Sequence, residues 1–268
     1  MEKLVKLLTQ LTVNEEFNSE LLPEVNVFRC EKRLMRAPNM LDPCIIVIAQ
    51  GSKIAYLGDE KFPFNAEKYL VLSQPIPFEC ETMATPRNPL LGVSICVQRE
   101  ILYELVSKTE RKQVEGGKNL IEKYRGMGST NLDKNMKLSV ERLLACLLNP
   151  DETIILGPSL LREVIYRALC GPYGPALFDL VGHNTNFERI SRALKQIHGN
   201  LASPLSVDLL ARKANMSVSS FHHAFREITL ETPIQYIKKV RLNKAKELIV
   251  QKKLPVNEIA VQVGYSST

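Results

Sequence analysis

The sequence predicts an α+β protein with a β-rich N-terminal part that carries helices and an all-α C-terminal part. Three observations predict this division. Residues 24–97 contain short β-rich runs cut by proline and glycine. From residue 101 on, apolar residues recur at helical spacing. Residues 201–229 form a helix-turn-helix pattern, and this pattern recurs 49 positions further along the chain.

The β-rich part predicts an all-β sandwich or a small barrel. Its expected strands are the runs 25–30, 44–51, 68–73 and 91–97. Short strands at close spacing with proline and glycine between them are typical of such folds. The stretch IIVIAQGSKIAYLGDEKFPF predicts a hairpin around Gly51-Ser52.

Helices are expected before and after these strands. Residues 1–12 predict a short helix, another follows Arg99-Glu100, and the glycine-rich residues 116–128 predict a loop or an edge. Three further helices are expected at Asn135–Leu148, at Ser159–Cys170 and at about residues 175–181. The first two are apolar enough to form a dimer surface, unless packing on their own barrel uses up their apolar faces.

The helix-turn-helix pattern is LASPLSVDLLARKANMSVSSFHHAFREIT. A linker at 183–186 and a short helix at 187–198 precede it. Ser206 is the expected N-cap of a helix over Val207–Ala214, and Ser217 caps a second helix that runs to about Ile228, with Asn215-Met216 as the turn. Apolar spacing predicts a small core, which leaves an outer face for the DNA major groove. The expected core residues are Val207, Leu210, Ala211, Phe221 and Phe225, and the expected outer residues are Ser219, His222, His223 and Arg226.

The repeat maps every apolar position of the first unit onto an apolar position. A shift of 49 residues places Leu205, Val207, Leu210, Ala211, Ala214, Asn215, Met216 and Ser217 on Leu254, Val256, Ile259, Ala260, Val263, Gly264, Tyr265 and Ser266. The turn position is Asn in one unit and Gly in the other, the two residues that best tolerate left-handed backbone. The sequence therefore predicts two helix-turn-helix units in tandem, the second ending at Thr268 inside its second helix.

A long helix is expected between the two units, capped by Thr232 with Pro233 in its first turn. Its expected inner stripe is Ile234, Ile237, Leu242, Ala245, Leu248 and Ile249. Its cations lie along or beside the other side: Lys238, Lys239, Arg241, Lys244 and Lys246. We predict phosphate contacts for Lys238, Lys239, Arg241 and Lys244, and for the N-cap Ser217 of the preceding helix. The alternatives are a solvated helix face for the lysines and, for Arg241, a structural role through carbonyl or carboxylate contacts.

Charge separates the two parts. Residues 1–188 carry 22 Lys+Arg and 24 Asp+Glu, whereas residues 189–268 carry 13 and 5, a net charge of +8. A basic domain joined to a near-neutral one is typical of a polyanion-binding protein. No apolar run approaches the roughly 20 residues of a membrane span, and the N-terminus lacks a signal-peptide pattern. We expect a cytoplasmic protein whose six scattered cysteines are reduced and buried rather than oxidant sensors.

These residues resemble the AraC/XylS family of bacterial transcription regulators. Three consecutive segments carry the resemblance: LSVDLLARKANMSVSSFHHAFRE, TPIQYIKKVRLNKAKELI and LPVNEIAVQVGYSS. A weaker likeness lies in GPSLLREVIYRALCGPYGPALFDL. The resemblance implies a cupin-like β-barrel effector domain over 1–130, a helical dimerisation segment and linker over 131–184, and the DNA-binding domain over 185–268. It places base contacts on Ser219, His222 and His223, with Arg226 one turn further along.

The resemblance also implies the partners. They are promoter DNA, an unknown small-molecule effector, a second copy of the chain and RNA polymerase, with no cofactor and no membrane. Compared with the family, the second recognition helix and the C-terminal helix are missing, so we expect a fragment or a second unit that cannot dock.

Two other functions compete with this interpretation. One is a small-molecule-binding or enzymatic cupin-like barrel with an accessory helical tail. A metal cupin needs clustered histidines, and none of His183, His198, His222 and His223 lies in residues 24–130, so we expect no metal and no enzyme. The other is a fragment that dimerises but does not bind DNA.

Overall fold

The computed structural model describes residues 1–12, 16–18, 22–73, 76–108, 126–178, 180, 186–229, 231–252 and 255–265. The chain divides into two compact units, Met1–Gly182 and His183–Thr268. The expected linker residues 183–185 and most of the glycine-rich segment 116–128 lie outside the described residues.

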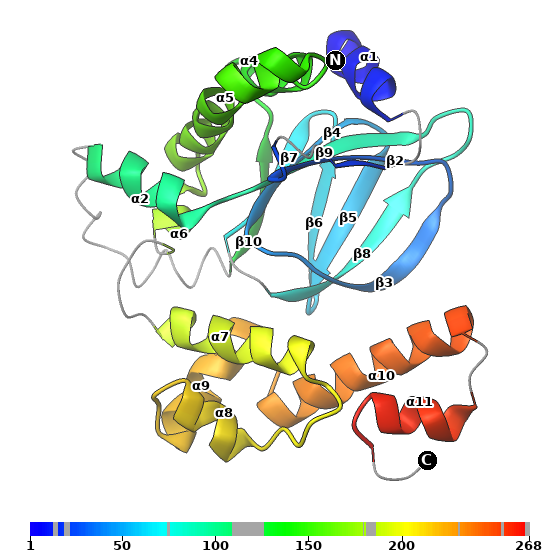
Figure 1. The fold of residues 1–268 in the computed structure, drawn as a ribbon, viewed down its shortest axis with the longest axis vertical. Helices are drawn as coiled ribbons and strands as arrows, with labels where there is room; N and C mark the ends of the chain where they lie inside the picture. The colour runs from blue at the N-terminus through cyan, green and yellow to red at the C-terminus, as the bar shows by residue number, and fades with distance from the viewer. Residues whose placement is uncertain are drawn as a thin grey trace. The chain divides into compact units, whose positions relative to one another are not determined.

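The first unit is built on an antiparallel sheet that curls into a half-barrel (Figure 1). Its strands follow the order β1-β2-β9-β4-β7-β6-β5-β8-β3, and β10 pairs with β7. Their bounds are β1 Glu16–Asn18, β2 Val25–Cys30, β3 Leu34–Met40, β4 Cys44–Gln50, β5 Ser52–Leu57, β6 Glu60–Asn65, β7 Lys68–Leu72, β8 Pro77–Met83, β9 Leu90–Cys96 and β10 Met127–Asn131. The runs predicted at 25–30, 44–51, 68–73 and 91–97 are therefore strands, within one residue at each end.

The predicted hairpin around Gly51-Ser52 is wrong. β4 pairs with β7 and β9, whereas β5 pairs with β6 and β8. Gly51 takes a positive φ of 77° and sends the chain from the centre of the sheet toward its other end. The hairpin lies one strand later, where Leu57 pairs with Glu60 across Gly58, which has a φ of 60°.

Helices cover one face of the sheet (Figure 1). They are α1 Glu2–Leu11, α2 Arg99–Lys108, α4 Lys134–Cys146, α5 Pro150–Cys170 and α6 Gly174–Phe178. α1 contacts β2, β4 and β9. The side chains of alternate residues in these strands are at most 1% exposed: Val25, Val27, Ile45, Val47, Val93 and Ile95. An apolar face of this kind needs a covering layer, which the helices supply.

The second large helix begins earlier than Ser159. α5 starts at Pro150, because the Asn149 side chain accepts hydrogen bonds from the backbone N–H groups of Asp151 and Glu152. Pro158 lies inside this helix. It leaves the carbonyl of Ile154 without an intrahelical donor, and Ile154 is 60% exposed, so water can satisfy that carbonyl.

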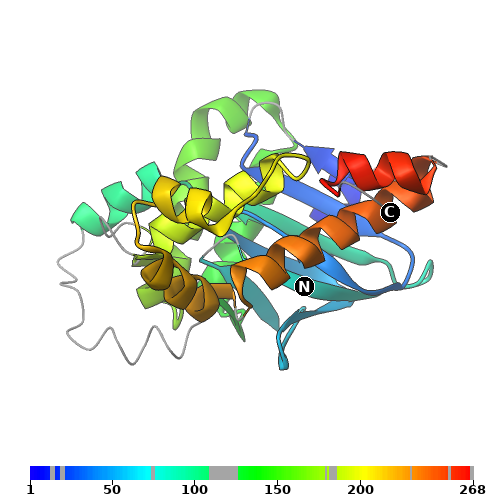
Figure 2. The same ribbon diagram turned by 90° about the horizontal axis from the view of Figure 1, so that it is seen from below.

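The second unit is helical. It comprises α7 Asn186–Gly199, α8 Val207–Lys213, α9 Val218–Thr229, α10 Pro233–Lys252 and α11 Val256–Gln262. α10 is long, and α11 packs beside its C-terminal end (Figure 2). Thr232 and Gln235 cap α10 reciprocally: the Thr232 N–H donates to Gln235 Oε1, and the Gln235 N–H donates to Thr232 Oγ1.

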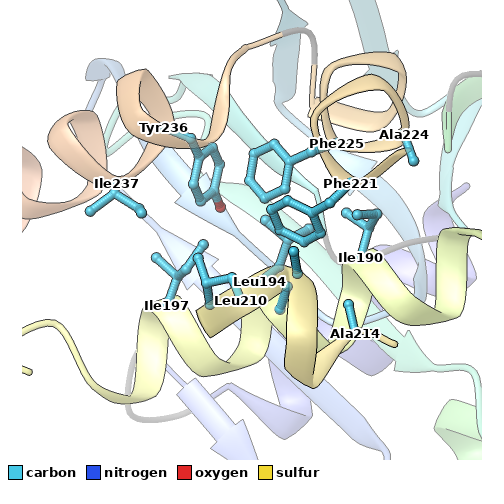
Figure 3. Close-up of a cluster of buried hydrophobic side chains, with 12 residues drawn as sticks. Ile190, Leu194, Ile197, Leu210, Ala214, Phe221, Ala224, Phe225, Tyr236 and Ile237 are labelled. Atoms are coloured by element: carbon cyan, nitrogen blue, oxygen red, sulfur yellow. The ribbon is translucent and has the colours of Figure 1, made fainter. Parts of the chain in front are cut away.

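Two apolar clusters hold this unit together. The larger one joins α7, α8, α9 and the start of α10 (Figure 3). Its buried members are Ile190, Ala193, Leu194, Ile197, Leu210, Ala211, Ala214, Phe221, Ala224, Phe225, Tyr236 and Ile237. The smaller one joins Leu248 of α10 to Ile259 and Val263 of the α11 segment. Each predicted helix-turn-helix unit thus has its own core, and α10 belongs to both.

The predicted inner stripe of α10 is partly wrong. Ile234, Leu242 and Ile249 are 65%, 51% and 51% exposed. The inner positions are Ile237, Arg241, Ala245 and Leu248, which recur at spacings of four, four and three. Because one of these inner residues is Arg241, apolar spacing alone does not reveal the stripe.

Candidate nucleic-acid interface

The first helix-turn-helix begins as the sequence predicts. The Ser206 side chain accepts from the Leu209 N–H and caps α8. α8 ends at Lys213, and Asn215 turns the chain with a positive φ of 53°. Asparagine is among the few residues that adopt this backbone readily. The Arg189 guanidinium of α7 donates to the Asn215 carbonyl at 3.2 Å, which ties the turn to the preceding helix.

Ser217 starts the second helix of the motif. Its Oγ accepts from the Ser220 N–H at 3.2 Å, and α9 follows from Val218. Phe221 and Phe225 point into the core, with ring centroids 5.4 Å apart, and Phe225 meets the Tyr236 ring edge-on at 5.4 Å. These anchors set which face of α9 remains outside.

The repeat is a structural repeat. α8 and α11 each have seven residues, and their bounds differ by 49 positions at both ends. The Met216 N–H donates to the Ala211 carbonyl at 3.0 Å, and the Tyr265 N–H donates to the Ala260 carbonyl at 2.9 Å. Gly264 has a φ of 88°, matching the left-handed turn at Asn215. The expected equivalents Leu254 and Ser266 lie outside the described residues.

The predicted base-contacting side chains share the outer side of α9. Ser219, His223 and Arg226 are exposed, and His222 is half-buried. His223 Nδ1 lies 3.4 Å from a carboxylate oxygen of Glu227. Glu227 is not among the predicted site residues, although its i,i+4 spacing from His223 indicates the contact. A donor that points outward from a helix at this position can reach a base edge in the major groove.

The predicted phosphate-contacting residues differ in their surroundings. Ser217, Lys238 and Lys244 are exposed, and Lys239 Nζ lies 2.8 Å from Glu231 Oε1. The guanidinium of Arg241 instead donates to the carbonyls of Leu201 and Ser203. This geometry favours the structural alternative for Arg241. The α10 cations therefore do not form one uniform basic face.

The first core contains a polar contact that apolar spacing does not predict. His198 Nε2 of α7 and the Tyr236 hydroxyl of α10 lie 2.7 Å apart. Burial lowers the pKa of His198 and raises the pKa of Tyr236. The apolar spacing of α7 predicts the helix, but it does not predict that the last turn contacts a buried tyrosine.

Comparison with known families identifies the chain. Residues 21–176, more than half of it, match the AraC-type transcriptional regulator N-terminus. The chain belongs to this family of transcription regulators. Residues 210–268 match a helix-turn-helix domain. The chain thus combines an AraC-type N-terminal part with a helix-turn-helix domain, and its family is one of transcription regulators and not of enzymes.

Curated relatives match a shorter stretch of the chain. The HTH-type transcriptional regulator AlkR of Acinetobacter baylyi is 40% identical over 78 residues, which is 29% of this chain and 26% of AlkR. The RCS-specific HTH-type transcriptional activator RclR of Escherichia coli is 34% identical over 79 residues, 30% of this chain and 28% of RclR. The matches span little more than a quarter of these relatives.

Solved structures share the fold of nearly the whole chain. An apo variant of ToxT from Vibrio cholerae superimposes with a TM-score of 0.59 at 12% identity, covering 95% of this chain and 90% of that one. Unsaturated fatty acid bound wild-type ToxT also gives a TM-score of 0.59, at 14% identity, covering 91% and 86%. At this identity the likeness establishes the half-barrel with its helices and the helical C-terminal part.

Within the described ranges, no group of three or more His, Cys, Asp or Glu side chains is placed to hold a metal ion. No helix in the described part of the chain is long and apolar enough to cross a membrane.

Proposed function

We propose that this AraC-type regulator binds its promoter through sequence-specific contacts from α9. Ser219, His222, His223 and Arg226 contact base edges in the major groove. Ser217, Lys238, Lys239 and Lys244 contact phosphates and orient the domain without specifying sequence. Arg241 joins the two helix-turn-helix units instead of touching DNA. The observation that carries the proposal is the 49-residue repeat of backbone geometry at Asn215 and Gly264, which gives the domain two related units on one helix.

We also propose that the half-barrel binds a small effector and that the protein acts in the cytoplasm. A curled sheet with a helix-covered outer face supports this, and the solved ToxT structure of the same fold holds an unsaturated fatty acid. An effector changes DNA binding only if its affinity differs between two arrangements of the protein. Regulation then reaches RNA polymerase through the occupancy or geometry of the bound regulator.

The second copy of the chain is the proposed partner of α4 and α5. Exposed large apolar side chains lie on these helices and on the turn that joins them: Leu138, Leu148, Ile154, Ile155, Leu156 and Tyr166. Water-exposed apolar groups at this density are typical of an association surface. Sedimentation equilibrium should give a dimer, and Ile155→Lys should give a monomer with unchanged helix content. A wild-type monomer at micromolar concentration would refute the proposed dimer.

Salt titration tests the DNA contacts. The full chain is bound to a duplex selected from a randomised pool, and the affinity is followed from low to moderate salt. The log–log slope should fall by about 1 for Lys238→Ala or Lys244→Ala, because each phosphate contact releases about one counterion. Glu100→Gln, a change on α2, serves as a control that leaves the slope unchanged. If the full chain selects no duplex, the proposed sequence-specific binding is wrong.

A further inference from the structure

A lysine projects over the inner side of the curled sheet. Lys53 on β5 has its Nζ 5.6 Å from the ring centroid of Phe28 on β2. Four strands, β9, β4, β7 and β6, separate β2 from β5 within the sheet. The two side chains therefore meet across the concave side and not along the surface of neighbouring strands.

The pairing register of the strands shows, independently of the Lys53–Phe28 contact, which side chains face the concave side of the sheet. Tyr173 lies against Gly128, where an added Cβ would be 1.7 Å from its ring, so Gly128 faces the helical segment. Gly128 pairs with Val71 and Val71 with Ile45, which places these residues on the outer, helix-covered face. Their chain neighbours Ile46, Leu70 and Leu72 then face inward, because side chains alternate along a strand.

The same alternation places Phe28 and Lys53 on the inner face. Phe28 and Ile48 both pair with Gly92, and Phe28 covers that glycine so closely that a Cβ there would lie 2.5 Å from its ring. Lys53 pairs with Phe64 and Thr82, which are 1% and 3% exposed. The Lys53 side chain therefore shares the inner face with the rings of Phe28 and Phe64 and with Thr82.

Acidic partners lie on the opposite face of these strands. Glu79 pairs with Arg36 and Glu81 with Arg33, and both carboxylates belong to strand positions that alternate with the inner ones. Lys53 takes part in none of the ion pairs formed among the described residues. Its polar neighbour is the Cys80 thiol, whose pKa is raised chiefly by burial and lowered in part by this ammonium. A cation over an apolar surface attracts an anion more strongly than it would in water.

We propose that Lys53 binds the acidic group of the effector and that the effector is an amphipathic carboxylic acid. The inference rests on the proposed effector function of the half-barrel. The Lys53 ammonium pairs with the carboxylate, and the Thr82 hydroxyl is placed to donate a second hydrogen bond beside it. The apolar body of the ligand lies along Phe28, Phe64 and the inward aliphatic side chains of β4 and β7. Neutral or cationic effectors would leave Lys53 unpaired in this apolar setting.

A matched lysine provides the control. Lys61 on β6 lies 5.9 Å from the Tyr56 ring and pairs with Tyr56 in the sheet, so it has the same charge and a similar aromatic contact on the outer face. Lys53→Met and Lys61→Met keep the aliphatic stem and remove the charge. Lys53→Arg keeps the charge. Thermal unfolding of each full-length variant checks that the fold is retained.

Isothermal titration calorimetry then measures the affinity of each full-length protein for four probes, each kept below its critical micelle concentration. They are a cis-unsaturated C16 fatty acid, 2-naphthoic acid and the methyl esters of both, so that aliphatic and aromatic acids are distinguished. For at least one pair, wild type should bind the acid about ten-fold or more tightly than the ester. This ratio is what one charge-assisted hydrogen bond is expected to contribute. Lys53→Met should abolish this preference, Lys53→Arg should retain most of it, and Lys61→Met should leave it unchanged.

Three outcomes would overturn the inference. In the first, acid and ester bind equally, and in the second, Lys53→Met keeps the preference for the acid. Either result leaves an effector site in the half-barrel but removes Lys53 from it. In the third, wild type binds none of the four probes, which refutes the ligand class. The duplex selection decides separately whether the protein is a sequence-specific regulator.

Discussion

The Arg241 guanidinium of α10 donates from Nη2 to the backbone carbonyl of Leu201 at 3.0 Å. The same nitrogen lies 3.1 Å from the Ser203 carbonyl, and the guanidinium carbon lies 5.6 Å from the Tyr265 ring centroid. The segment before the first helix-turn-helix, the connecting helix and the turn of the second unit therefore converge on one side chain. This side chain sets the relation between the two units.

Replacing Arg241 separates a structural role from a phosphate contact. Arg241→Ala leaves two carbonyls without their charged donor, which should cost roughly 1–3 kcal/mol of unfolding free energy. It should leave the salt slope of DNA binding unchanged. Lys238→Ala should do the reverse, with unchanged stability and a slope lower by about 1. Urea unfolding measures the stability, and salt titration measures the slope. If Arg241→Ala keeps full stability and lowers the slope, Arg241 contacts a phosphate and the structural role is wrong.

Gly264 should tolerate no side chain. Its φ is 88°, and an added Cβ would lie 2.2 Å from the Leu201 carbonyl oxygen. Gly264→Ala should therefore lower the free energy of unfolding by roughly 1–2 kcal/mol because of left-handed strain, and by more because of the clash. The equivalent change Asn215→Gly should be close to neutral, since glycine adopts that backbone freely. Chemical denaturation compares them, and a Gly264→Ala protein as stable as wild type would contradict this account of the turn.

His198 should make the stability of the second unit depend on pH. Burial holds its pKa below the ordinary 6.5, so the unfolded chain takes up a proton at a pH where the folded chain does not. The stabilising contribution is present in full above pH 6.5 and is lost as the pH falls from there toward the folded pKa. Melting temperature should fall over this window, and His198→Asn should flatten the profile. His223→Asn, on an exposed side chain, is the control, and an identical wild-type and His198→Asn profile would exclude this linkage.

The cysteines should differ in reactivity. All six are free, with Cys44, Cys80 and Cys146 buried and Cys170 exposed, which corrects the expectation that all are buried. Burial raises the pKa of Cys44 to about 12, so its reactive thiolate is scarce at neutral pH. Maleimide labelling followed by peptide mass spectrometry should modify Cys170 rapidly and Cys44 only after unfolding. Equal labelling rates in the native protein would be inconsistent with this burial.

The sequence predicted most of the local structure and little of the long-range pairing. The caps Ser206, Ser217 and Thr232 and the turn at Asn215 depend on neighbouring residues, and all are confirmed. The Gly51 hairpin failed because a glycine turn gives a local bend but does not determine which strands pair. Pro158 concealed the start of α5, since a local rule against proline outweighed the cap at Asn149.

The site divides in the same way. The outer face of α9 follows from the spacing of Phe221 and Phe225, so Ser219, His222, His223 and Arg226 could be selected without a structure. The role of Arg241 depends on a segment 40 residues away, and the place of Lys53 depends on the curl of a whole sheet. No local pattern encodes either contact.

The central claim is that α9 specifies the DNA sequence, and duplex selection tests it most directly. Wild type, the double variant His222→Ala with His223→Ala, and the control Arg192→Ala on α7 each select from one randomised pool as full chains. We predict that the double variant accepts changed bases at the positions facing α9. In wild type, each such change should weaken binding by about 1–3 kcal/mol, and in the double variant this penalty should be lost. The control should keep the wild-type preference. An unchanged consensus for the double variant would contradict the assignment of α9 as the base-contacting helix.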